Sequence, residues 1–220
     1  MSTAAALLAE RRDVLLDFDG PVCAVFGVVT DAAVAERLRL LLPGDPPAHV
    51  MQAHDPFEVL RYAATVNADL AAEVEAEFHQ QECRAVADAP PTPGAFEAIR
   101  SLHAAGHRII MVSNNSKEAV RRFLHLHGLA EAVTAISARS DADPSHLKPA
   151  PFLLLQAMRQ IETTPDQCVM IGDSITDVQA AHAARLPAIA YANKPGKREA
   201  FQRQRAEAVI DQMNELLIER

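Results

Sequence analysis

The stretch Val14-Leu15-Leu16-Asp17-Phe18-Asp19-Gly20 places two carboxylates directly after a short apolar run. The apolar residues predict a buried strand over 14–18 of an α/β sheet. Ligands of such sheets bind in the crevice beyond the carboxyl ends of the strands. There, one carboxylate could act as nucleophile or metal ligand and the other as general acid and base. The alternative is a simple turn, which Asp and Gly also favour.

The rest of the chain consists of a helical block followed by alternating helices and strands. Apolar spacing predicts helices over 31–42, 55–67 and 69–87, with no strand between them. After a Pro-rich linker, further helices are expected over 95–105, 117–127, 151–161, 174–185 and near the C-terminus. The strands between them are expected at 108–112, 133–137, 167–171, 188–191 and near Val209. This alternation predicts a doubly wound parallel sheet, which the helical block interrupts after the first strand.

Composition and charge restrict the classes of function. The 220 residues suffice for one core with an inserted subdomain. A net charge of −8 lacks the electrostatic footprint for nucleic acid or an anionic membrane, so neither is expected as a partner. The three cysteines lack metal-ligand spacing, and the N-terminal segment does not fit a secretory signal. No apolar run reaches membrane-spanning length. We therefore expect a cytoplasmic protein.

Three further groups of polar residues could complete a site around the first two carboxylates. Ser113 and Asn114 follow a predicted strand, and a hydroxyl with the N–H groups of a turn suits phosphate oxygens. Lys148 could neutralise charge on a bound phosphate and on the nucleophile. Asp173 and Asp177 follow another strand and can share one side of a helix's first turn. Hard oxygen ligands of this kind suit Mg²⁺.

Each of these residues also has a purely structural interpretation. Ser113 or Asn115 could cap the helix that begins near Lys117. Lys148 could be a solvated surface lysine. The pattern Ser174-x-x-Asp177 fits a capping box, a role that is compatible with support of a metal site. The order of acidic, hydroxyl, lysine and acidic elements favours one common site.

In that order the motifs resemble those of the haloacid dehalogenase-like (HAD) hydrolase superfamily, and the resemblance covers nearly the whole chain. The matching motifs are Asp17-Phe18-Asp19-Gly20, Ser113-Asn114, Lys148-Pro149 and Gly172-Asp173-Ser174-x-x-Asp177. The resemblance implies a HAD-like Rossmannoid core over 1–22 and 90–220. It also implies an α-helical cap over 23–89, as in the phosphoglycolate phosphatase and β-phosphoglucomutase branch.

The resemblance further implies a mechanism and a cofactor. Asp17 would attack the phosphoryl group, and Asp19 would protonate the leaving oxygen and then activate the hydrolytic water. Mg²⁺ would be held by the side chains of Asp17 and Asp173 and by the backbone carbonyl of Asp19. Asp177 would support the metal's waters or the lysine from behind these ligands. The phosphate would be held by Ser113, the N–H of Asn114 and Lys148.

Substrate selection would come from the cap. The best candidates are His54, in a loop over 43–56 that also contains His49, Gln52 and Asp55, and Arg61 on the next helix, which could meet an anionic tail. One departure from the family pattern is Pro21, which stands where Thr or Ser is usual. Because proline fixes φ and lacks an N–H, the hinge toward the cap is expected to be stiffer or displaced.

The leading hypothesis is a Mg²⁺-dependent phosphatase, a phosphomonoester hydrolase that acts on a small phosphorylated metabolite through an aspartyl phosphate. It would act as a monomer or homodimer. A phosphomutase of the same fold shares every core residue and stays open, as does a non-catalytic module that binds a phosphorylated ligand. Phosphonate cleavage would need a cap lysine, and the sequence has no lysine between Asp19 and Arg100.

Overall fold

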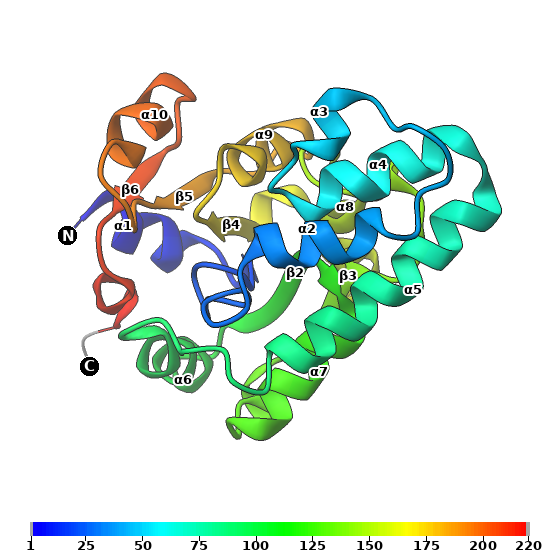
Figure 1. The fold of residues 1–220 in the computed structure, drawn as a ribbon. Helices are drawn as coiled ribbons and strands as arrows, with labels where there is room; N and C mark the ends of the chain where they lie inside the picture. The colour runs from blue at the N-terminus through cyan, green and yellow to red at the C-terminus, as the bar shows by residue number, and fades with distance from the viewer. Residues whose placement is uncertain (1, 219–220) are drawn as a thin grey trace.

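The computed structural model describes residues 2–218, which contain one parallel sheet (Figure 1). Within these residues the sheet has six strands in the order β3-β2-β1-β4-β5-β6, and every neighbouring pair is parallel. The strands are β1 (Asp13–Leu16), β2 (Arg108–Ser116), β3 (Ala135–Arg139), β4 (Cys168–Gly172), β5 (Ala188–Tyr191) and β6 (Ala208–Ile210). The strand order changes direction between β1 and β4, which is where sheets of this kind bind ligands. The predicted doubly wound sheet is therefore confirmed.

Side chains that alternate along the strands divide the core into two layers. Val14 and Leu16 of β1 face one layer, Leu15 faces the other, and all three are fully buried. The first layer is covered by α1 (Thr3–Glu10), α6 (Ala95–Ala104) and α7 (Lys117–Leu126). The second is covered by α8 (Phe152–Gln160), α9 (Ile175–Ala183) and α10 (Lys197–Arg203).

Four of the five helices between β1 and β2 form a separate layer, which we call the helical insertion. They are α2 (Asp31–Arg39), α3 (Ala48–Met51), α4 (Pro56–Val66) and α5 (Ala68–Ala85). The insertion has its own apolar cluster, in which Val34, Leu60 and Phe78 come from three different helices. Leu147 of the sheet-bearing part packs into the same cluster. In Figure 1, α5 runs diagonally away from the other insertion helices toward α7, which it contacts.

Two segments join the helical insertion to the sheet, and they run side by side. The N–H of Ala24 donates to the carbonyl of Pro90 at 3.0 Å, and the N–H of Thr92 donates to the carbonyl of Val22 at 3.0 Å. Pro21 lies directly before this crossing. Its effect on a hinge stays a prediction.

Residues 2–218 contain three helices that the sequence pattern does not predict, namely α1, α3 and α10. They have eight, four and seven residues. Helices this short span about two turns or fewer, so apolar periodicity barely develops in them. The helix expected near the C-terminus is a short 3-10 turn, η4 (Met213–Leu216). The other 3-10 turns are η1 (Ala130–Ala132), η2 (Pro144–His146) and η3 (Pro165–Gln167).

Strand β2 is longer than predicted. It continues past residue 112 to Ser116, with a shift of its register against β3 between Ser113 and Ser116. Such irregularities re-aim side chains at the end of a strand. Over residues 2–218, the structure offers no helix with the length and apolar character required to traverse a bilayer.

Candidate active site

The carboxyl end of β1 brings Asp17 to the centre of the candidate site. Its N–H donates to the carbonyl of Ile171 in β4 at 2.9 Å. Its Oδ1 accepts a hydrogen bond from the N–H of Phe18 at 2.8 Å and lies 2.7 Å from Nζ of Lys148. Among residues 2–218 no hydrogen bond is made to Oδ2. One oxygen of Asp17 is thus fixed, and the other is available to a ligand.

Lys148 is a buried cation between two carboxylates, with only 3% of its side chain exposed. Nζ lies 2.6 Å from Oδ1 of Asp177 and donates to the carbonyl of Val112 at 3.1 Å. Burial alone would lower the pKa of Lys148, but Asp17 and Asp177 together raise it above its ordinary value. Burial also raises the pKa of Asp17, and Asp177 adds to that effect against the opposing charge of Lys148. Lys148 is therefore a permanent positive charge on the floor of the site, not a solvated surface lysine.

Asp177 forms the capping box that the sequence suggested and also contacts Lys148, whereas its support of a metal site stays a prediction. Its Oδ2 accepts hydrogen bonds from the N–H and the hydroxyl of Ser174, at 2.9 and 2.6 Å, which completes a capping box at the start of α9. Gly172 leaves the space that this carboxylate fills, because a Cβ there would lie 2.4 Å from Cγ of Asp177. Gly20, with φ at +101°, does the same for Asp173, whose Cγ would lie 2.3 Å from a Cβ. The motif glycines are thus needed for close packing of the acids.

Asp19 turns its carboxylate toward the segment that leads into the helical insertion. Its Oδ1 accepts a hydrogen bond from the N–H of Val25 at 2.8 Å. Burial raises the pKa of Asp19 to about 6, and the Asp173 carboxylate contributes in the same direction. A carboxyl group in that range can both donate and accept a proton near neutral pH.

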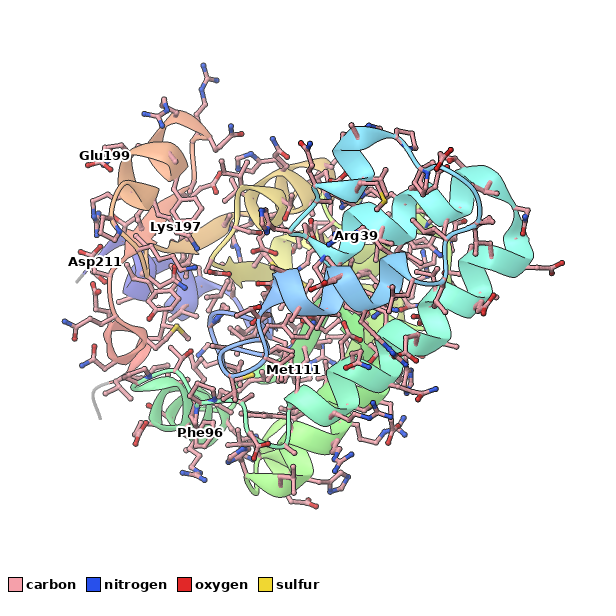
Figure 2. All side chains as sticks on the ribbon, in the orientation of Figure 1. Arg39, Phe96, Met111, Lys197, Glu199 and Asp211 are labelled. Carbon is pink, nitrogen blue, oxygen red and sulfur yellow. The ribbon has the colours of Figure 1, made fainter. Side chains whose placement is uncertain are left out.

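Asp173 is held by two residues that sequence reasoning missed. Its Oδ2 accepts hydrogen bonds from Nδ2 of Asn193 at 2.8 Å and from Nζ of Lys197 at 2.6 Å. Lys197, labelled in Figure 2, lies in the first turn of α10 and also donates to the carbonyl of Asp173. Both residues follow β5 at the same edge of the sheet. Their position after a predicted strand is the same signal that marks Asp17, Ser113 and Asp173.

The end of β2 brings Ser113 and Asn114 to the same site. Oγ of Ser113 is buried, accepts from the N–H of Asn115 and donates to its Oδ1, both at 3.1 Å. The side chain of Asn114 pairs with the backbone of Lys148, accepting from its N–H at 2.8 Å and donating to its carbonyl at 3.2 Å. Neither Ser113 nor Asn115 caps α7. That interpretation was wrong, because β2 runs on and Ser116 is the N-cap.

A hollow of about 220 Å³ lies where these side chains converge. From the sheet-bearing part its walls include Asp17, Asp19, Ser113, Asn114, Asn115, Lys148, Asp173, Ser174 and Thr176. The helical insertion contributes Asp55, Phe57 and Arg61, of which sequence reasoning missed Phe57. Arg61 contacts Oε1 of Glu58 at 3.0 Å and Oδ2 of Asp55 at 3.8 Å. His54 is exposed and does not line the hollow, and Asp177 lies behind Lys148.

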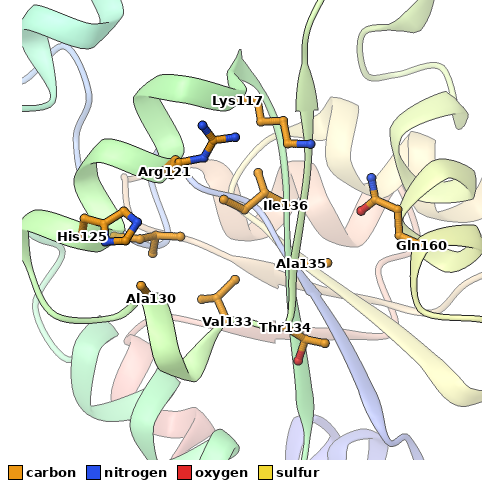
Figure 3. A pocket seen from close by; sticks show the side chains of 10 residues that line it. Lys117, Arg121, His125, Ala130, Val133, Thr134, Ala135, Ile136 and Gln160 are labelled. Atoms are coloured by element: carbon orange, nitrogen blue, oxygen red, sulfur yellow. The ribbon is translucent and has the colours of Figure 1, made fainter.

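A larger hollow of about 480 Å³ lies elsewhere, between α7 and β3 (Figure 3). Its polar lining comes from Lys117, Arg121, His125, Thr134 and Gln160. No carboxylate lines it within the described part of the chain. Size therefore does not identify the candidate site, whereas the convergence of acidic, hydroxyl and lysine side chains at the strand ends does.

The net negative charge at the strand ends favours binding of a divalent cation. Asp17, Asp173 and Asp177 each offer an oxygen, and these atoms lie within 4.8 Å of one another. Asp17 and Asp177 contact the ammonium group of Lys148, Asp173 contacts that of Lys197, and Asp19 is a fourth carboxylate that lines the same hollow. When all are ionised, two negative charges remain, which is the charge that one divalent cation balances. Carboxylate oxygens are the donors that Mg²⁺ prefers.

Comparison with known proteins relates the chain to one family. Residues 14–185 match the family model described as haloacid dehalogenase-like hydrolase. A phosphoglycolate phosphatase from Vibrio vulnificus (strain YJ016) is 27% identical over 191 residues, which are 80% of this chain and 81% of the relative.

Solved structures with the same fold extend over almost the whole chain. A protein from Clostridium acetobutylicum, described as a predicted phosphatase, has a TM-score of 0.73 at 18% identity and covers 94% of this chain and 96% of its own. CbbY from Rhodobacter sphaeroides, in complex with xylulose-(1,5)bisphosphate, has a TM-score of 0.71 at 18% identity, with 93% and 96% covered. At these identities the structures show a shared fold.

Proposed function

The chain belongs to the haloacid dehalogenase-like hydrolase family, and from this premise we propose that it is a Mg²⁺-dependent phosphatase. It would hydrolyse the phosphomonoester of a small phosphorylated metabolite through an aspartyl phosphate on Asp17. The observation that carries this proposal is the environment of Asp17. One of its oxygens is fixed by Lys148 and the Phe18 N–H, and the residue lines a hollow together with Asp19, Ser113 and Asp173.

Two displacements at phosphorus would make up the reaction. First, a carboxylate oxygen of Asp17 forms a bond to phosphorus, the bond to the leaving oxygen breaks, and the protonated carboxyl of Asp19 gives its proton to that oxygen. The carboxylate of Asp19 then takes a proton from a water whose oxygen attacks the same phosphorus. The acyl phosphate bond breaks, inorganic phosphate leaves, and the Asp17 carboxylate is restored. A carboxylate nucleophile divides one difficult displacement into two easier ones.

Positioning and charge neutralisation together would supply most of the rate enhancement in both displacements, as is general for phosphoryl transfer. The buried ammonium of Lys148, the hydroxyl of Ser113 and the N–H of Asn114 would hold the phosphoryl oxygens. Mg²⁺ would be bound by the side chains of Asp17 and Asp173 and by the carbonyl of Asp19, and would neutralise charge on the phosphoryl oxygens. Asn193 and Lys197 support this arrangement, because they hold Oδ2 of Asp173 and leave Oδ1 for the metal.

The helical insertion would act as a cap that selects the substrate, with residues 23–89 as the cap and residues 1–22 and 90–220 as the catalytic core. Three of its residues, Asp55, Phe57 and Arg61, line the hollow, so the insertion can contact a leaving group. The small volume of about 220 Å³ favours a short substrate. Arg61 is half-buried and could pair with an anionic tail, which is consistent with the phosphoglycolate phosphatase relative.

The proposal is tested by the release of inorganic phosphate from an aryl phosphate and from a panel of phosphorylated metabolites. We expect turnover by the wild type with Mg²⁺, none with EDTA, and loss of about four orders of magnitude or more in Asp17→Asn, as for removal of other catalytic nucleophiles. The variant should remain folded by circular dichroism, since Asn has the shape of Asp.

Two results would count against hydrolysis. Isomerisation of a sugar phosphate without net phosphate release would favour a phosphomutase. Absence of any turnover by a folded wild type that binds Mg²⁺ would favour a module that binds a phosphorylated ligand without catalysis.

A further inference from the structure

A second buried cation lies between two carboxylates, outside the proposed catalytic residues. Arg139, the last residue of β3, has only 1% of its side chain exposed. Its Nη2 donates to Oε2 of Glu82 at 2.6 Å, and its Nη1 donates to Glu75. Both acids belong to α5 of the helical insertion. The guanidinium carbon also lies 4.5 Å from the ring centre of Phe78 on the same helix. Arg139 therefore ties α5 to the end of the sheet.

Arg139 and Glu82 also hold the segment that follows Ser113. Nε of Arg139 donates to the carbonyl of Asn114 at 2.9 Å. Glu82 accepts from the N–H of Ser116 at 2.9 Å and from Nδ2 of Asn115 at 3.0 Å. Three consecutive residues after Ser113 are thus each bound by Arg139 or Glu82.

Glu82 also determines which way the Asn115 amide faces. An ionised carboxylate only accepts hydrogen bonds, so Asn115 must present its NH₂ group to Glu82. Its Oδ1 then faces the hydroxyl of Ser113, at 3.1 Å. The contacts run without a gap from α5 through Asn115 to the hydroxyl that lines the hollow.

Stability alone does not account for this arrangement. A buried ion pair contributes little net stability compared with apolar side chains of the same volume, because desolvating two charges is costly. Glu82 is fully buried, and its carboxylate accepts hydrogen bonds from two residues of the turn, Asn115 and Ser116, and from Arg139. What the pair does supply is fixed geometry at residues 114–116.

We propose that Arg139 and Glu82 are positioning residues for phosphate binding. They fix the turn 113–116 so that the hydroxyl of Ser113 and the N–H of Asn114 face the phosphoryl group, although neither charged side chain lines the hollow. This inference rests on the proposed function, because it takes Ser113 and Asn114 as phosphate ligands. It adds α5 to the elements on which the phosphate site depends.

The test compares two identical substitutions at opposite ends of the sheet. Arg139→Lys keeps the charge but removes the fork that reaches both acids and the turn. Arg108→Lys is the matched control, since Arg108 makes an equally close pair with Asp13, at 2.6 and 2.7 Å, at the other end of β2 and β1. Glu82→Gln provides a second variant with the shape of the native side chain. The affinity for inorganic phosphate is measured by titration calorimetry with Mg²⁺, at a temperature where circular dichroism shows each protein folded.

We expect Arg139→Lys and Glu82→Gln to weaken phosphate affinity about ten- to a hundredfold, since small misplacements of binding groups cost that much. KM should rise in parallel, whereas Arg108→Lys should stay within about twofold of the wild type in both quantities. If both variants are folded and bind phosphate as tightly as the wild type, Arg139 and Glu82 do not position the phosphate ligands. The proposed function would still stand in that case, provided that the wild type hydrolyses phosphate esters. A folded wild type that neither binds phosphate nor hydrolyses any ester would overturn both proposals.

Discussion

Two buried cations, Lys148 and Arg139, lie between pairs of carboxylates in this protein, and their surroundings differ. Lys148 contacts Asp17 and Asp177, and a hollow opens beside it. Arg139 contacts Glu75 and Glu82, and its guanidinium is enclosed by the Phe78 ring and by the turn after Ser113. We call Lys148 with its acids the open cluster, because these residues lie at the candidate site. We call Arg139 with Glu75 and Glu82 the closed cluster, because its cation is enclosed, although Glu75 itself lines a separate hollow.

The difference shows what makes a charged cluster chemically useful. Around Lys148, further acids leave negative charge unbalanced, and Asp17 keeps an oxygen without a protein partner among residues 2–218. Around Arg139, the donors and acceptors pair with one another and with backbone groups. A carboxylate oxygen without a protein partner next to a hollow allows a ligand to bind, whereas complete pairing around an enclosed cation fixes geometry.

The largest expected effect is on the rate of phosphate release, which should depend on the charge of the open cluster. Lys148→Met removes the positive charge from the open cluster, and we expect kcat/KM to fall about 10²- to 10³-fold, as when one preorganised donor to a developing charge is lost. Kinetics of phosphate release measure this. Lys117→Met, in the separate hollow between α7 and β3, is the control and should keep wild-type rates. Equal rates in the two variants would mean that the open cluster does not carry the chemistry.

A second effect uses metal binding, which should involve the open cluster alone. Mg²⁺ at about a hundred times its dissociation constant is expected to stabilise the wild type by about 2–3 kcal/mol against urea unfolding. Asp173→Asn should lose that increment, because it removes a carboxylate from the proposed ligand set. Glu82→Gln should keep it, since Glu82 belongs to the closed cluster. If Asp173→Asn gained as much from Mg²⁺ as the wild type, the cation would bind elsewhere.

The smallest effect concerns pH and the closed cluster. Burial raises the pKa of Glu75 from 4.5 to about 7, and the Glu82 and Asp141 carboxylates add to this against the lowering effect of Arg139. The folded protein therefore binds a proton that the unfolded chain releases, and the stability this provides is lost as pH rises from about 4.5 to 7.

Glu75→Gln should remove that contribution. We expect the difference in unfolding free energy between pH 5 and pH 8 to shrink by about 1 kcal/mol, after allowance for partial exposure. Urea unfolding at both pH values measures this. Glu77→Gln on the same helix serves as control, because hydrogen bonds from Gln81 and Arg37 lower the pKa of Glu77 and it has no such contribution to lose. If the unfolding free energy of Glu75→Gln fell as much between pH 5 and pH 8 as that of the wild type, the pH dependence would not come from Glu75.

The two clusters also differ in how far sequence could predict them. The fold and the open cluster follow from local patterns, because apolar strands end in polar residues and parallel strands bring those ends to one edge. Asp17, Ser113 and Asp173 can be identified in this way. Lys148 was named from its motif, and its burial between two acids came from the structure.

The closed cluster left no comparable signal. Glu82 is one of several acidic residues on α5, and nothing in the local pattern distinguishes it from its solvated neighbours. Its partner Arg139 is 57 positions away and ends a strand whose predicted limits stopped short of it. Only tertiary packing decides which charge on an acidic helix becomes buried.

The tie between Arg139 and α5 has a consequence for attempts to exchange parts of this protein. A chimera in which residues 23–89 are replaced by the corresponding segment of a relative would exchange the residues proposed to select the substrate. It would also remove Glu82. The turn after Ser113 would then lose its acceptor even though every residue of the recipient scaffold was retained. Functional chimeras of this chain should therefore keep the last turns of α5 with the recipient, or transfer a matching arginine and glutamate together.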